Sequence, residues 1–186
     1  MNTIIQGKTV DLKIIDESDI EQLREWRNSN YVSDFMISRT FISKDQQEQW
    51  YNTIKNDPSG IYWVIFSKEG VKLGLASLTK IDRINNEAEP GLYIGTKTHR
   101  NSFYGMEAYY YILDYGFQQI GLEKIFGTVI SSNKTAIKMN SSFGFVTNTV
   151  LKAEIVVNGI PQDIYKVVLS KKAFYESKMV KFFSIK

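Results

Sequence analysis

The chain has 186 residues, of which 43% are hydrophobic and 13% aromatic, and this length suits one domain with one core, expected over residues 1–186. It has no cysteine and a single histidine, which excludes a disulfide scaffold, cysteine-based zinc sites, a thiol nucleophile and any metal centre that needs two imidazoles. The 23 basic and 20 acidic side chains are spread along the chain, and no segment approaches the ~18 apolar residues that span a bilayer, so a cytoplasmic protein without a nucleic-acid or membrane partner is expected.

The N-terminal part of the chain predicts one short strand followed by one helix. Residues 10–14 alternate between apolar and polar side chains, as in a half-buried strand. Ser18 or Asp19 is placed to cap a helix that runs to about Arg27. The polar run Asn28–Ser29–Asn30 is then expected to end that helix.

A second helix and an antiparallel meander are predicted next. The helix begins after Ser43, with a glutamine three or four residues inside it, and stops before Asp57–Pro58. Aromatic and β-branched residues then favour three strands. These strands lie at residues 62–66, 73–79 and 92–94, and a turn at 68–70 joins the first two.

Helical crossovers are predicted in the second half of the chain. Residues 104–119 carry an apolar stripe wide enough for a helix that lies on a sheet. The later elements are a strand at 124–130, a helix at 135–142 ended by Gly144, a hairpin of 146–157 and 165–169 that turns at Asn158–Gly159, and a final helix within 171–186. This order predicts an α/β fold (an α+β mixed sheet) that is antiparallel first and crosses over through helices later.

The first chemically informative segment is the strand Glu89–Gly95, the loop after it and the start of the long helix. A helix N-terminus leaves about four N–H groups unpaired and carries roughly half a positive charge, so it suits a pyrophosphate. Small residues such as Gly105 would let an anion approach the backbone. The alternative is that Gly105 eases helix packing on the sheet and that Arg100 lies in water.

The second segment begins at Asn133, where a strand ends and a short helix begins. The Asn133 amide could point into the space between neighbouring strands, and Ala136 would leave room for a ligand. The alternative is that Asn133 only caps the helix, because asparagine is a preferred capping residue.

Together the two segments resemble the acetyl-CoA-binding core of the GNAT N-acetyltransferase superfamily. In its helix loop, R/Q-x-x-G-x-G/A, Arg100 and Gly105 match the ends, and Phe103 stands at the middle glycine. In its later motif, N-x-x-A-I-x-x-Y-x-K-x-G-F, Asn140 stands at the tyrosine, and the matching residues are Asn133, Ala136, Ile137, Gly144 and Phe145. The resemblance implies a GNAT-type fold, a central, largely antiparallel mixed sheet flanked by helices, with acetyl-CoA as co-substrate and no metal.

The resemblance also implies which residues contact the cofactor. The strand backbone would pair with the pantetheine arm, the N–H groups of residues 101–105 would hold the pyrophosphate, and Asn133 would reach the pantetheine or thioester. The implied cofactor-binding residues are Leu92, Tyr93, Ile94, Arg100, Asn101, Ser102, Phe103, Tyr104, Gly105, Asn133 and Ala136.

Acetyl transfer to an amine requires the uncharged amine, because an ammonium has no lone pair. Glu89 is the acidic residue best placed to act as a base, and Glu87 lies on the same face of its strand. An N–H near Tyr93 or Ile94 would stabilise the oxyanion. Asn140 is the second candidate catalytic residue, because members of the superfamily often place there a tyrosine that protonates the departing thiolate. The thiolate could otherwise leave unassisted, or the proton donor could be Ser141, Ser142, Tyr104 or His99.

The N-terminal half is expected to face the acceptor, a small-molecule amine. Its segments R-N, F-M, F-I-S, E-G-V-x-L-G and S-L-T-K-I resemble the amino-sugar N-acetyltransferases of pseudaminic acid biosynthesis. This resemblance implies a nucleotide-linked amino sugar whose diphosphate contacts Arg27, Thr79, Lys80 and Tyr93. Met36 and Trp50 would contact the apolar face of the sugar. Packing in the core is the alternative for these aromatic side chains.

Other acceptors and one other class of function stay open at this point. The run from Ala88 to Tyr93 is similar to the A-E-x-G-Y pattern of ribosomal-protein N-terminal acetyltransferases, and a polyamine acetyltransferase is a further alternative. A catalytically silent acyl-CoA sensor would keep the cofactor site without a base at the thioester. A homodimer is the assembly left open.

Overall fold

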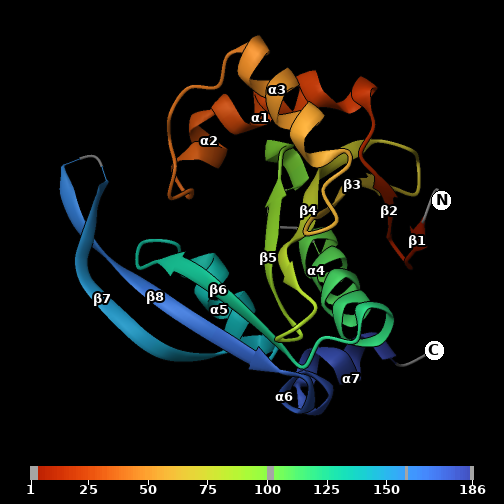
Figure 1. Ribbon diagram of the computed structural model, residues 1–186, viewed down its shortest axis with the longest axis vertical. Helices are drawn as coiled ribbons and strands as arrows, with labels where there is room; N and C mark the ends of the chain where they lie inside the picture. The colour runs from red at the N-terminus through yellow and green to blue at the C-terminus, as the bar shows by residue number, and fades with distance from the viewer. Residues whose placement is uncertain (1–3, 100–102, 158, 185–186) are drawn as a thin grey trace.

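The computed structural model describes residues 4–99, 103–157 and 159–184. One eight-stranded mixed sheet runs through it in the order β1-β2-β3-β4-β5-β6-β8-β7 (Figure 1). The strands are β1 (Ile5–Gln6), β2 (Val10–Ile14), β3 (Ile61–Ser67), β4 (Lys72–Asp82), β5 (Glu87–Ile94), β6 (Lys124–Ile130), β7 (Val146–Val157) and β8 (Ile160–Ser170). All neighbours pair antiparallel except β5 and β6, which are parallel. The predicted mixed, largely antiparallel sheet is therefore confirmed.

Helices cover both faces of the first five strands. The helices are α1 (Ile20–Asn28), α2 (Asn30–Ser33), α3 (Lys44–Ile54), α4 (Tyr104–Tyr115), α5 (Lys134–Ser142), α6 (Lys171–Glu176) and α7 (Lys178–Ser184). Buried residues of α1 and α3 form one cluster against β3, while α4 packs on the other face. Of these helices in the described ranges, none is both long and apolar enough to cross a membrane.

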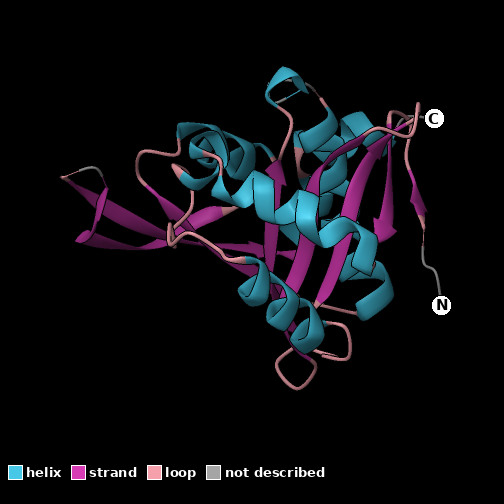
Figure 2. Cartoon of the chain, turned by 90° about the horizontal axis from the view of Figure 1, so that it is seen from above, coloured by secondary structure: helices cyan, strands magenta, loops and turns pink. Residues whose placement is uncertain are grey.

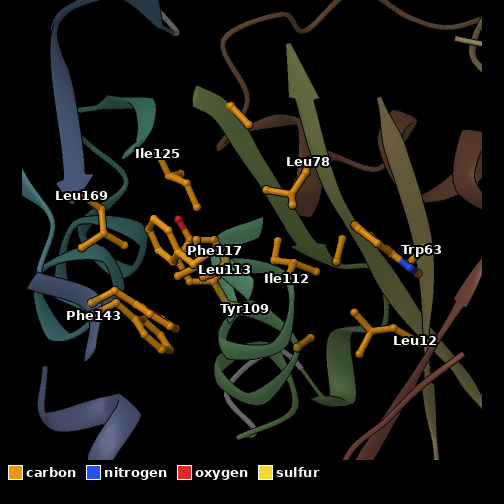
Figure 3. Packing of buried hydrophobic residues seen from close by; sticks show 14 of the residues in the cluster. Leu12, Trp63, Leu78, Tyr109, Ile112, Leu113, Phe117, Ile125, Phe143 and Leu169 are labelled. Carbon is orange, nitrogen blue, oxygen red and sulfur yellow. The ribbon is translucent and has the colours of Figure 1, made fainter. Parts of the chain in front are cut away.

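The main core lies between α4 and the sheet (Figure 3). Trp63 of β3, Ile112 of α4 and Phe117 after it are fully buried there. The same cluster extends through Phe143 to Phe174 of α6, whose rings lie 6.4 Å apart. One continuous core thus joins the two halves of the sheet.

Side-chain caps fix where the first helices begin. Ser43 accepts a hydrogen bond from the Gln46 N–H and so starts α3 as predicted. Asp19, one of the two predicted caps, lies at the position before α1, but its side chain makes no capping hydrogen bond to that helix. Asp16 accepts from the Ser18 N–H instead and begins a 3₁₀ turn at Glu17–Asp19. The Asp19 carboxylate instead binds the Asp16 N–H and the Lys72 ammonium.

Several short or irregular elements were not predicted. The run after Asn28 does not stay irregular, because α2 begins at Asn30. The long helix ends at Tyr115 and continues as a π turn over Gly116–Ile120, which Gly121 closes at φ +82°. The C-terminal segment forms two helices rather than one, and Phe174 of α6 is fully buried and stacks on Tyr110 of α4.

β5 and β6 separate soon after they begin to pair. Their parallel ladder contains two pairs, Glu87 with Lys124 and Ala88 with Ile125. Pro90 follows on β5 and has no N–H to offer to a neighbouring strand. The strands therefore diverge, and the hairpin of β7 and β8 extends away from the first half of the sheet (Figures 1 and 2).

A buried carboxylate joins the β1–β2 turn to α4. Glu107 is 2% exposed and accepts hydrogen bonds from the N–H groups of Lys8 and Thr9 and from the Thr9 hydroxyl. These contacts give Glu107 a structural role, since its partners belong to the β1–β2 turn.

Replacing Glu107 with alanine is expected to lower the free energy of unfolding by about 3 kcal/mol, because N–H groups lose charge-assisted hydrogen bonds. Urea unfolding followed by circular dichroism measures this change. Glu48→Ala, at an exposed position of α3, is the matched control and should stay within about 0.5 kcal/mol of the parent. Equal effects of the two substitutions would contradict the anchoring role.

Candidate active site

The edge of β5 that faces β6 is available to a ligand beyond Ala88. The Gly95 N–H donates to the Leu73 carbonyl of β4 at 2.7 Å. The N–H groups of successive residues in a strand point alternately to its two neighbouring strands. The N–H of Tyr93 is therefore directed at β4, whereas Leu92 and Ile94 direct theirs at the opening between β5 and β6. The Ile94 carbonyl, on that same edge, accepts from the Tyr31 hydroxyl at 3.1 Å. Of the two oxyanion donors expected from the sequence, the Ile94 N–H is the one this geometry favours.

The N-terminus of α4 lies close to this edge because Gly105 has no side chain. A Cβ on Gly105 would meet Ile94 Cγ1 at 3.4 Å and Leu92 Cδ2 at 3.6 Å. Arg100, Asn101 and Ser102, expected at the pyrophosphate, lie outside the described residues. The free strand edge and the closely packed helix start fit an extended pantetheine arm that ends in a diphosphate.

Phe103 and Tyr104, the other predicted residues at this helix start, point in different directions. Phe103 is 54% exposed and lies against Phe182 of α7, with the ring centroids 5.4 Å apart. The Tyr104 ring is half-buried against the core and lies 5.6 Å from the His99 ring. Neither aromatic ring fills the space beside Gly105 that a Cβ would meet.

The Asn133 side chain caps α5. Its Oδ1 accepts a hydrogen bond from the Ala136 N–H at 3.0 Å, so the capping alternative is what the structure shows for this atom. Ala136 is half-buried against the core. A role of Asn133 toward the thioester would have to use its amide nitrogen.

Asn140 is buried and held by a residue that sequence reasoning missed. The Tyr109 hydroxyl of α4 donates to Asn140 Oδ1 at 2.9 Å, and both side chains are buried. Burial raises the pKa of Tyr109 well above its ordinary value, so the phenol stays protonated. The amide nitrogen of Asn140 is left for the cavity of about 340 Å³ that lies between α5 and the strands β6, β7 and β8. Tyr109 lay on the apolar stripe of the helix, where only packing was expected.

Glu87 and Glu89 project from the same side of β5, and each binds a lysine. Lys80 Nζ lies 2.6 Å from Glu89 Oε2, and Lys124 Nζ lies 2.7 Å from Glu87 Oε2. Lys80 sits at an irregularity of β4 with φ +51°, and its side chain is 69% exposed, whereas Glu89 is 21% exposed. The predicted base therefore has an exposed ammonium as its counter-ion.

A cavity of about 350 Å³ lies on the face of the sheet covered by α1 and α3. Arg27, Trp50 and Tyr93, three residues predicted at the acceptor, line it together. Its other lining residues are Leu23, Ser38, Thr40, Phe41, Ile42, Gln46, Gln47 and Leu75. Gln47, a buried amide on α3, also lines this cavity, although it was not among the residues expected to contact the acceptor.

The other predicted acceptor residues lie elsewhere. Met36 is half-buried in the turn after α2 and is absent from the cavity lining. The Thr79 hydroxyl donates to the Glu89 carbonyl at 3.2 Å, and Lys80 binds the Glu89 carboxylate. Two of the predicted diphosphate contacts are thus partners of the candidate base.

Two polar atoms in the acceptor cavity are buried without a partner. Arg27 Nη1 and the Tyr93 hydroxyl make no hydrogen bond within the part of the chain that the structure describes. Burial raises the pKa of Tyr93, and the nearby positive charge of Arg27 only partly opposes this. Unpaired buried polar atoms are costly, so a ligand that pairs with them would gain affinity. Among residues 4–99, 103–157 and 159–184, no group of acidic or histidine side chains could hold a metal ion.

Comparison with known proteins gives one family. Residues 10–146 match the model of the acetyltransferase (GNAT) domain. A spermidine N(1)-acetyltransferase of Vibrio cholerae is 23% identical over 163 residues, which cover 88% of this chain and 94% of the relative. An uncharacterized N-acetyltransferase, p20, of Bacillus licheniformis is 24% identical over 168 residues, 88% of this chain and 93% of that one.

Solved structures agree with this family. The crystal structure of the spermidine N-acetyltransferase from Vibrio cholerae in complex with CoA and spermine has a TM-score of 0.84 at 23% identity, and the match covers 90% of this chain and 99% of that one. The predicted fold is thereby confirmed. These relatives support neither the amino-sugar nor the ribosomal-protein branch that the sequence resembled.

The buried phenol of Tyr109 predicts a specific dependence of stability on pH. Above about pH 10 the tyrosine ionises in the unfolded chain but stays protonated in the fold, so the free energy of unfolding falls as pH rises. Tyr109→Phe is expected to lower the free energy of unfolding by about 1 kcal/mol at pH 8, because the hydrogen bond to Asn140 is lost. Above pH 10 the free energy of unfolding of this variant should fall less steeply than that of the parent. Urea titrations between pH 8 and 11 measure both slopes, and parallel slopes would contradict the buried, protonated phenol.

Proposed function

Because the chain belongs to the acetyltransferase (GNAT) domain family, it is an N-acetyltransferase that uses acetyl-CoA, and we propose that its acceptor is a polyamine. The support comes from relatives in Vibrio cholerae and Escherichia coli that carry the name spermidine N(1)-acetyltransferase. The relatives match this chain over 81–88% of its length. The family match covers residues 10–146, which include the β5 edge and the residues that line the acceptor cavity.

Two carboxylates on the acceptor side of β5 support a cationic acceptor. Glu87 and Glu89 each hold an alkylammonium group in the fold, those of Lys124 and Lys80. An ammonium of a polyamine has the same chemistry as a lysine side chain, and the exposed Lys80 could yield its position to it. This pair of ammonium-binding carboxylates is the observation that carries the proposal.

The residues of the chain would divide the reaction as follows. Acetyl-CoA supplies the activated acetyl group. Glu89 would take a proton from the acceptor ammonium, directly or through water, so that the nitrogen lone pair can attack. The Ile94 N–H would stabilise the negative charge that develops on the carbonyl oxygen. The amide nitrogen of Asn140, oriented by Tyr109, would offer a hydrogen bond rather than a proton to the leaving sulfur.

A nucleotide-linked amino sugar is the second candidate, and the acceptor cavity favours it. The cavity is lined by the cation Arg27 and by no carboxylate, and Arg27 Nη1 and the Tyr93 hydroxyl are unpaired. A polycation would find no counter-charge there, whereas phosphate or sugar oxygens would pair with both groups. The two candidates therefore predict opposite responses to removal of the Arg27 charge.

Acetyl-CoA consumption should be measured with spermidine, spermine, a nucleotide-linked amino sugar and an N-terminal peptide. We expect turnover with spermidine, and we expect Arg27→Gln to lower the KM for spermidine severalfold, because it removes a like charge. Arg83→Gln is the control, since Arg83 is exposed and does not line the cavity. Turnover of the amino sugar alone, with a KM that Arg27→Gln raises tenfold or more, would establish the second candidate instead.

Glu89→Gln is expected to lower kcat about 100-fold while the affinity for acetyl-CoA is unchanged, because the base is lost but the β5 backbone edge is not. Glu176→Gln on α6 is the control, because it removes a carboxylate that also binds a lysine but lies outside the proposed site. Steady-state kinetics and calorimetric titration with CoA measure the two effects. Equal activity of the two variants would exclude Glu89 as the base. If the unmodified protein acetylated none of the amines, a binding protein would be favoured instead.

A further inference from the structure

The C-terminal helix α7 lies beside the start of α4 through aromatic contacts. The Phe103 ring lies 5.4 Å from Phe182 and 6.1 Å from Phe183, measured between centroids. Phe183 in turn stacks on Tyr110 of α4 at 5.1 Å. Figure 1 shows α7 next to α4. The last helix is therefore in contact with Phe103, the residue directly before α4, in the segment expected to hold the pyrophosphate.

This contact leaves two aromatic rings open to water. Phe103 is 54% exposed and Phe182 is 55% exposed, although Phe183 beside them is half-buried. Adjacent exposed aromatic rings are unusual on a surface that binds nothing. Packing against α7 explains why Phe103 is partly covered, but it does not explain why the outer faces of both rings stay open.

Two lysines share a face of α7 with Phe182. Lys178, Lys181 and Phe182 are spaced i, i+3 and i+4 and are all exposed. In the described part of the chain neither lysine makes an ion pair. An aromatic face flanked by two ammonium groups suits a ligand that carries both a flat base and a phosphate.

We propose that this surface, the α7 platform (Phe103, Lys178, Lys181 and Phe182), binds the adenosine 3′-phosphate end of coenzyme A. The adenine ring stacks on the two exposed phenylalanines, and the lysines neutralise the 3′-phosphate. The start of α4 lies next to the platform, so a diphosphate held there leaves the adenosine at its edge. The proposal accounts for a large residue at position 103, since its ring points toward α7. It rests on the use of acetyl-CoA and not on the identity of the acceptor.

Calorimetric titration without any acceptor tests the stacking contact. Phe182→Ala is expected to weaken CoA binding about tenfold, a typical effect of removing one aromatic platform under a base. The same substitution should leave the affinity for 4′-phosphopantetheine unchanged, because that fragment has no adenosine. Phe182→Trp should keep the CoA affinity and show quenched fluorescence when CoA binds. Equal weakening for both ligands would mean that α7 only supports the fold, and unchanged CoA affinity would overturn the platform.

The lysines are tested with a ligand that lacks one phosphate. The double variant Lys178→Ala/Lys181→Ala should weaken binding of CoA but not of 3′-dephospho-CoA. Lys172→Ala on the neighbouring α6, an exposed lysine outside the platform, is the control and should change neither. If the double variant keeps its CoA affinity but loses binding to phosphatidylglycerol vesicles or loses self-association, the face serves a membrane or a second copy and the proposal is wrong.

CoA affinity in the parent separates the two proposals. Binding of CoA without turnover of spermidine would contradict the polyamine acceptor. The platform would then still be decided by the titrations with 4′-phosphopantetheine and 3′-dephospho-CoA. Failure of the parent to bind CoA would overturn the platform together with the cofactor site.

Discussion

The divergence of β5 and β6 is the constraint on which the rest of the site depends. Their ladder ends after Ala88 and Ile125, and within the described residues no strand lies opposite the backbone of Leu92 and Ile94 on that edge. Pro90 helps to end the ladder, since it has no N–H to donate. The helices α4 and α5 keep the two halves joined below the opening, through the core and the Tyr109–Asn140 hydrogen bond. A thioester can therefore lie where a strand would otherwise pair.

Two parts of the acceptor side of β5 differ in charge, and the difference decides what each can bind. On the acceptor side of β5, Glu87 and Glu89 hold lysine ammonium groups, while the nearby cavity contains Arg27 and no carboxylate. An acceptor must satisfy both environments. A charged amine suits the carboxylates, and an oxygen-rich group suits the unpaired Arg27 and Tyr93 atoms. The sign of this local charge separates the candidate acceptors more sharply than the overall shape of the fold does.

Most of the regular structure could be predicted because its signals are local. The capping box at Ser43, the run of β-branched and aromatic residues in β3 and the glycine that ends α5 lie within a few residues of the elements they fix. The wrong predictions also arise locally, where neighbouring polar residues could make more than one set of hydrogen bonds. Asp16 caps the 3₁₀ turn before α1, and the Asp19 carboxylate bonds back to the Asp16 N–H and to Lys72 instead of capping α1. The short α2 begins at Asn30, within the polar run that was expected to end the helical structure.

The sequence by itself determined the fold class, the candidate cofactor strand and the face of β5 that carries Glu87 and Glu89. Only the tertiary structure decided which charges are neutralised and which rings meet. Lys80 binds Glu89, Tyr109 holds Asn140 and Phe103 packs on α7. These contacts join residues from 9 to 79 positions apart, and side-chain partners at such separations are set by how the elements pack. Periodicity fixes the face on which a residue lies, but the residue that it meets there is decided by packing of the whole chain.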